Sequence, residues 1–88
     1  MPEIIIPIDM LLDAAGDFKK AHKETSAIRV NLDRKMKSLE KSWSDLSKQQ
    51  FFRYYRELDR QLTSCNEIMS VLAQEMQAIA ERYAELNK

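Results

Sequence analysis

The sequence predicts an all-α protein, a hairpin of two long antiparallel helices that dimerises into a four-helix bundle. On both sides of a short polar stretch near the midpoint, apolar residues recur at alternating steps of three and four positions. That spacing is typical of helices packed along a seam. The 88 residues include one Gly and two Pro, so little of the chain is left for irregular structure. At this length we expect residues 1–88 to form a single domain.

The first helix is predicted over about residues 7–42. Pro7 suits the first helical position, where its missing N–H is not needed, and it disfavours helix in the residue before it. The centre of the predicted seam is polar, at His22, Thr25 and Arg29. The full set of predicted seam positions is Ile8, Leu11, Ala15, Phe18, His22, Thr25, Arg29, Leu32, Met36, Leu39 and Trp43.

The turn is predicted at Trp43, Ser44 and Asp45, and the second helix at about residues 46–86. Ser44 or Asp45 can serve as the N-cap of this helix, because short polar side chains accept a backbone N–H there. Its predicted seam comprises Phe51, Tyr55, Leu58, Leu62, Cys65, Met69, Leu72, Met76, Ile79, Tyr83 and Leu86. Cys65, the single cysteine, is therefore expected to be a small buried apolar residue.

Further small or apolar residues flank both seams and widen the apolar stripe. They are Ala14, Ala21, Ile28, Phe52, Ile68, Ala73 and Ala80, and they are the predicted dimer interface. A two-helix rod covers only one narrow seam, so a second hairpin packed alongside is expected. A homodimer is the favoured arrangement, and a heterodimer with a different helical hairpin is the alternative.

The chain lacks the residue patterns of an enzyme or a cofactor-binding protein. One His and one Cys cannot build a zinc site or a disulfide within the chain. There is no Gly-rich phosphate loop and no nucleophile motif. We expect no catalytic, metal-binding or cofactor-binding residues and no cofactor.

Charge and hydropathy argue against nucleic acid and membrane partners. The 14 basic and 14 acidic residues balance, so no overall field attracts a polyanion. Arg53, Arg56 and Arg60 could form a phosphate-binding stripe, but the interleaved Glu57 and Asp59 favour a solvated helix face. No apolar run approaches the ~18 residues of a membrane span, and residues 4–8 lack the flanks of a secretory signal peptide.

The residues around the turn resemble the WXG-100, or ESAT-6-like, family. Trp43 is followed by Phe51 eight residues on and by Tyr55 twelve residues on, as the family pattern requires. The family's Gly after Trp-X is replaced by Asp45. The end of the second helix, at residues 79–83, is similar to the homodimeric branch found in Bacillota.

The resemblance implies a small non-enzymatic protein, made in the bacterial cytoplasm and secreted as a folded dimer by a type VII system through its ATPase. It implies an export signal at Tyr83 and Asn87, where Asn87 stands in place of the family's acid. It also implies a composite surface between Trp43 of one protomer and the tail of the other. The alternative function is a targeting partner or chaperone that heterodimerises with a larger type VII effector.

Overall fold

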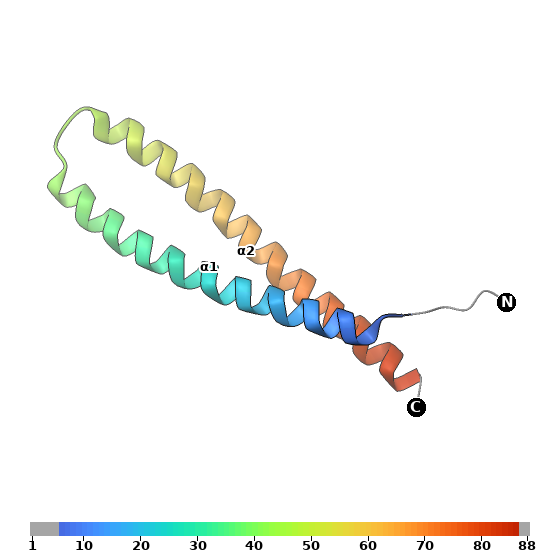
Figure 1. Cartoon of the computed structure of the whole chain (residues 1–88). Coiled ribbons are helices and arrows are strands. Elements are labelled where there is room, and N and C mark those ends of the chain that lie inside the picture. The colour runs from blue at the N-terminus through green and yellow to red at the C-terminus, as the bar shows by residue number, and fades with distance from the viewer. Residues whose placement is uncertain (1–5, 87–88) are drawn as a thin grey trace.

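A computed structural model describes residues 6–86 as two long helices joined by a short turn (Figure 1). Helix α1 spans Ile8–Ser42 and helix α2 spans Ser47–Leu86. They run antiparallel side by side and form a thin rod with principal extents of 68 × 21 × 13 Å. No strand occurs in the described part of the chain. The predicted all-α hairpin is confirmed.

Helix α1 begins without a side-chain cap. Pro7 occupies the N-cap position, with φ −77° and ψ 74°, and its carbonyl accepts the N–H of Leu11 at 2.9 Å. Pro7 therefore lies just outside the helix, which begins at Ile8, one residue after the predicted start. Asp9 in the first turn supplies negative charge near the helix N-terminus. The helix ends at Ser42, and the extended backbone of Trp43 turns the chain toward α2.

Asp45 caps α2. Its Oδ1 accepts the backbone N–H of Ser47 at 3.2 Å, and its carbonyl accepts the N–H of Lys48 at 3.1 Å. These bonds use two of the N–H groups that a helix start leaves unpaired. No described residue has a positive φ. This turn therefore has no need of the left-handed conformation that favours glycine, and an aspartate fits the family's glycine position.

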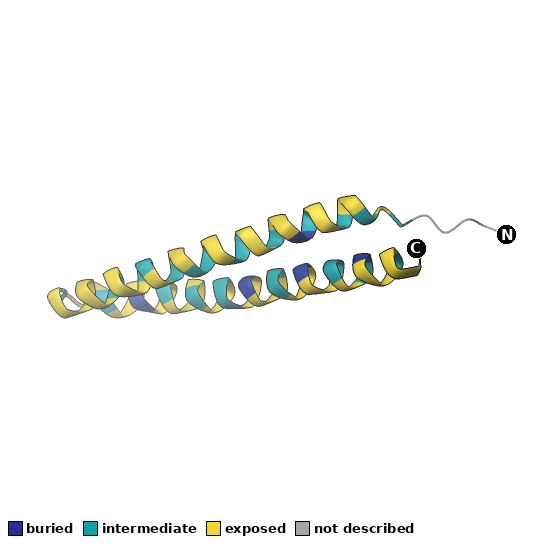
Figure 2. Cartoon of the chain, turned by 90° about the horizontal axis from the view of Figure 1, so that it is seen from below, coloured by how far each residue is buried: buried dark blue, intermediate teal, exposed yellow. Residues whose placement is uncertain are grey.

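The helices pack through one seam, visible in Figure 2 as the buried and half-buried stripe on their facing sides. On α1 the seam follows the predicted positions, with Ala15 buried and the others half-buried except Leu39, which is exposed. The predicted seam of α2 consists of two columns, each a set of residues spaced seven positions apart. One column is right, because its members Tyr55, Leu62, Met69, Met76 and Tyr83 are half-buried.

The other predicted column of α2 was wrong by one residue. The seam contains Phe52, Asp59, Asn66, Ala73 and Ala80, of which all but the half-buried Asp59 are buried. The predicted column comprised Phe51, Leu58, Cys65, Leu72, Ile79 and Leu86. Ile79 is half-buried, whereas the other five, Cys65 included, are exposed.

Two physical reasons explain this shift. Ala73 and Ala80 are small, so the backbone of α1 can approach closely where they face it. Asp59 and Asn66 provide hydrogen-bonding partners for the polar centre of the α1 seam. Large apolar residues in their place would have left those polar groups without partners.

This correction divides the predicted dimer-interface residues into those buried within the chain and those still accessible to a partner. Phe52, Ala73 and Ala80 are buried inside the chain's own seam, so they have almost no surface left for a second chain. Ala14 and Ala21 are half-buried beside the seam, while Ile28 and Ile68 are 55% and 58% exposed. The surface available to a partner therefore differs from the predicted set.

Candidate interaction surfaces

A layer of polar side chains crosses the middle of the seam. Arg29 donates to Asp59 Oδ1 from Nε at 3.3 Å and from Nη2 at 3.2 Å. One turn away, the Asn66 Nδ2 amide donates to Ser26 Oγ at 2.8 Å, and His22 Nδ1 lies 3.0 Å from the Asn66 carbonyl oxygen. Because a carbonyl only accepts, His22 must carry its proton on Nδ1 in this contact.

Asn66 is the most constrained member of this polar layer. It is 7% exposed, and its Oδ1 is buried without a hydrogen-bond partner. A single buried asparagine in a helical seam costs stability but fixes the register of the two helices. The sequence pattern missed this role because the prediction placed the neighbouring Cys65 in the seam.

Four aromatic rings cluster where α2 leaves the turn. The Trp43 ring centroid lies 5.0 Å from that of Phe51 and 6.0 Å from that of Phe52. Phe52 meets Phe51 edge-on at 5.2 Å and Tyr55 at 6.5 Å. Burial raises the pKa of the Tyr55 phenol, and the carboxylates of Asp33 and Asp59 raise it further.

Trp43 and Tyr83 lie at opposite ends of the rod. Trp43 follows α1 at the turn, whereas Tyr83 is half-buried near the end of α2, beside the start of α1 (Figure 1). Asn87, the other predicted export residue, lies outside the described residues. Ser44 and Asp45 are exposed beside Trp43 in the turn. One chain alone does not bring the turn residues and Tyr83, the predicted export residue, together.

One side of the hairpin carries an apolar face. Phe51, Leu58, Cys65, Leu72 and Ile79 each precede a seam residue of α2 by one position, about 100° round the helix, so they flank the seam on one side. On α1 the matching positions are Ala14, Ala21 and Ile28. We define the apolar face as Ala14, Ala21, Ile28, Phe51, Leu58, Cys65, Ile68, Leu72 and Ile79.

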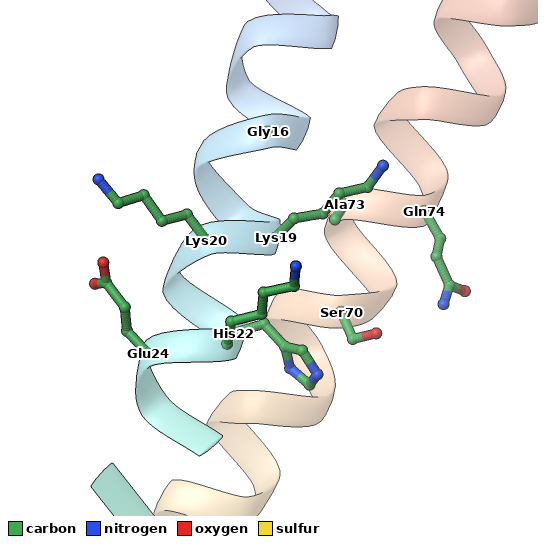
Figure 3. A pocket seen from close by; sticks show the side chains of 9 residues that line it. Gly16, Lys19, Lys20, His22, Glu24, Ser70, Ala73 and Gln74 are labelled. Carbon is green, nitrogen blue, oxygen red and sulfur yellow. The ribbon is translucent and has the colours of Figure 1, made fainter. Parts of the chain in front are cut away.

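The opposite side of the hairpin is polar and hollowed. Near the open end, a hollow of about 590 Å³ is lined by Gly16, His22, Lys19 and Ala73, among others (Figure 3). The Nζ of Lys19 donates to the Gln77 side chain across it. A Cβ added at Gly16 would meet nothing within 4 Å, so within this chain Gly16 is a glycine on the solvent side of the helix.

Arg53, Arg56 and Arg60 of α2 lie on this polar side, but not all of them are available to bind a phosphate. Arg60 donates to Glu57 from Nε at 3.0 Å, and Gln61 donates to the same carboxylate. The bond from Arg60, followed by that from Gln61, lowers the pKa of Glu57. Arg53 and Arg56 instead line a hollow of about 440 Å³ between the helices. No group of three or more potential metal ligands occurs among residues 6–86.

Comparison with solved structures places the same hairpin in a known protein. The crystal structure of the secreted protein EsxB from Bacillus anthracis strain Sterne is similar, with a TM-score of 0.82 and 23% identity over 100% of both chains. Its wild-type form in another crystal has a TM-score of 0.78 and 24% identity, covering 96% of this chain and 97% of EsxB. A search of curated protein sequences found no match.

Within residues 6–86 neither helix is apolar enough over a sufficient length to cross a membrane.

The sequence itself identifies the family. Residues 3–88 match the family profile "WXG100: Proteins of 100 residues with WXG". Since this match spans almost the whole chain, the protein belongs to the WXG100 family.

Proposed function

We propose that this protein is a non-enzymatic substrate of a type VII secretion system, exported as a folded homodimer. Membership of the WXG100 family and the similarity to a secreted EsxB protein support this proposal. The observation that carries the dimer is the apolar face, because a soluble hairpin with so many exposed apolar side chains gains stability when a partner covers them.

The α2 part of the apolar face has a symmetric spacing that favours a second copy as the partner. Five of its six members, all but Ile68, recur every seven residues, with Cys65 at the centre. Two antiparallel copies related by a two-fold axis at Cys65 would pair Phe51 with Ile79 and Leu58 with Leu72 of the partner. Each of these five residues would then face an apolar residue of the other copy.

Charge favours the same antiparallel arrangement. The polar layer divides the rod into a turn half, residues 26–65, and an open half, residues 8–25 and 66–86. The turn half contains nine basic and five acidic side chains, a net charge of +4. The open half contains four basic and eight acidic ones, a net charge of −4. Antiparallel copies place each positive half beside a negative one, whereas parallel copies would oppose like charges.

This dimer would also complete the export surface. In antiparallel copies the turn of one chain lies beside the open end of the other, so Trp43 of one copy approaches Tyr83 of its partner. We propose that Trp43, Ser44 and Asp45 together with Tyr83 and Asn87 form the surface recognised by the secretion ATPase. Recognition of a surface made by two chains would restrict export to folded dimers.

Cysteine crosslinking tests the arrangement of the dimer. In the native chain, Cys65 should give a covalent dimer with a short bismaleimide. In a Cys65→Ser background, a mixture of Phe51→Cys and Ile79→Cys chains should crosslink as heterodimers, while neither chain alone should do so. Crosslinked Phe51→Cys homodimers would indicate parallel packing and overturn the proposed arrangement.

Export tests the functional assignment separately. In a Bacillota host with an active type VII system, Tyr83→Ala should abolish appearance of the protein in the medium, whereas Arg82→Ala, at the exposed neighbouring position, should not. Deleting the ATPase should block export of the unaltered chain. The solution mass of each variant checks that the dimer is intact. Normal export of a dimeric Tyr83→Ala variant would refute the role of Tyr83.

The exposed apolar face also favours a second candidate, a targeting partner of a larger effector with its own helical hairpin. This function predicts a poorly helical monomer when the chain is purified alone, and a helical complex on co-expression. A stable dimer near twice the 10.3 kDa chain mass would exclude the need for another partner and favour the homodimeric substrate.

A further inference from the structure

The turn half of the hairpin carries a groove with concentrated positive charge. One hollow of about 440 Å³ is lined by Glu40, Lys48, Gln49, Phe52, Arg53 and Arg56. The adjoining hollow, of about 530 Å³, is lined by Lys37, Glu40, Lys41 and Lys48. The two share Glu40 and Lys48, so they form one continuous depression between α1 and α2. We call it the basic groove and define it by Lys37, Glu40, Lys41, Lys48, Phe52, Arg53 and Arg56.

Most of the positive charge in the basic groove is not neutralised within the chain. Among the described residues, the ion pairs are Arg29–Asp59, Lys37–Asp33 and Arg60–Glu57. None involves Lys41, Lys48, Arg53 or Arg56, and Glu40 is the single acid that lines the groove. The first turn of α2 also contains no acid, and the Asp45 carboxylate that caps this helix bonds to Ser47 and does not line the groove.

The basic groove lies on the opposite side of α2 from the apolar face. Arg56 follows the seam residue Tyr55 by one position, whereas Phe51 and Leu58 precede their seam residues by one position. Since each step rotates the side chain by about 100°, the two sets flank the seam on opposite sides. A second copy seated on the apolar face would therefore leave the groove open.

We propose that the basic groove is a docking site for a short acidic segment of a second protein. Arginine at positions 53 and 56 offers planar guanidinium groups that bind carboxylates in a bidentate manner, while Lys48 supplies charge from the same helix and Lys41 from α1. The buried Phe52 ring in its floor provides an apolar contact for the stems of the bound side chains.

The length of the groove favours a short peptide over a nucleic acid as its ligand. From Lys48 to Arg56 the groove runs about 12 Å along α2, which matches about four residues of extended peptide at ~3.3 Å per residue. A longer polyanion would continue over the open half, with its net charge of −4. A short acidic peptide avoids this repulsion, whereas a nucleic acid gains affinity by adding phosphate contacts along its length.

Binding of labelled glutamate oligomers to the full chain tests the proposal. At about 50 mM NaCl, where surface charges are weakly screened, affinity measured by fluorescence anisotropy should rise up to about four residues and then level off. Arg53→Glu/Arg56→Glu should weaken hexaglutamate binding by about tenfold or more. Lys20→Glu/Lys23→Glu, which makes the same charge change in the open half, should alter it by less than about twofold.

Three results would overturn the proposal. Equal loss of binding in both double variants would mean that net charge, and not the groove, attracts the peptide. Tighter binding of a single-stranded RNA dodecamer, lost in Arg53→Glu/Arg56→Glu, would assign the groove to nucleic acid. Adsorption to phosphatidylglycerol vesicles without any binding of hexaglutamate would assign it to a membrane surface. Helical content and dimer mass, measured for each variant, keep these outcomes independent of the export proposal.

Discussion

Substitution of Ala73 tests the close approach of α1 and α2. Ala73 is 2% exposed in the seam, so the three extra carbon atoms of Ala73→Leu have no space unless the helices separate. Inserting such a side chain into a packed core costs about 1–3 kcal/mol. At about 2 kcal/mol, the melting temperature of a chain of this size should fall by about 8–16 °C.

The assay is thermal unfolding followed by circular dichroism at a fixed chain concentration, because dimerisation makes the melting temperature depend on concentration. Gln74→Leu is the matched control, since it adds a similar apolar side chain at the next, exposed position. It should change stability by less than about 0.5 kcal/mol. If Ala73→Leu has the same melting temperature as the unaltered protein, the seam does not contain Ala73. The same conclusion follows if Gln74→Leu lowers the melting temperature as much as Ala73→Leu does.

Three further substitutions probe polar contacts of the hairpin. Asp45→Ala removes the cap of α2 and should cost about 1 kcal/mol in urea unfolding, most of which Asp45→Asn should restore. Arg29→Ala breaks the half-exposed pair with Asp59 and should cost about 1 kcal/mol at low salt; an equal loss in 1 M NaCl would contradict an electrostatic role. The lowered pKa of Glu57 stabilises the fold above the ordinary carboxyl pKa of 4.5, and this contribution disappears as the pH falls through the lowered value. Glu57→Gln should therefore weaken the fall in the free energy of unfolding at acid pH. An unchanged fall would exclude Glu57 as a contributor to it.

Much of the fold follows from the spacing of apolar residues. The chain has almost no Gly or Pro, so the three- and four-residue steps on both sides of Trp43 leave few alternatives to two long helices. The α1 seam was predicted correctly even at His22 and Arg29, because its polar residues keep the heptad spacing. The aromatic cluster agrees with the spacing between Trp43, Phe51 and Tyr55.

The α2 seam could not be predicted from hydrophobicity alone. The column containing Leu58 and Leu72 is the more apolar one, and it would be the preferred seam if apolar content decided the packing. The polar groups of α1 decide it instead, since Arg29 requires Asp59 and Ser26 bonds to Asn66. A sequence-based argument would have to match polar residues at equal distances from the turn, as Arg29 and Asp59 are.

The surfaces were harder to predict than the fold. Of the predicted interface residues, Ile28 and Ile68 are exposed as contact with a partner would require, whereas Ala73 and Ala80 are buried between the two helices of the hairpin. The basic groove depends on Lys41 from α1 lying beside Lys48 from α2, and these residues belong to different helices. Its continuity across two helices is visible only once their relative rotation is known.

The polar layer also has a consequence for the order in which the hairpin folds. It separates the aromatic cluster near the turn from the alanine-lined packing near the open end, so contact between large apolar residues is interrupted midway. The aromatic cluster closes a short loop, which costs little chain entropy, whereas Ala15 and Ala80 come from distant parts of the sequence. We expect the hairpin to close from the turn outward and to fray from its open end. Amide hydrogen exchange should then be slowest in the helical residues on either side of the turn, 32–42 of α1 and 51–62 of α2, and should quicken beyond Asn66 toward the end of α2.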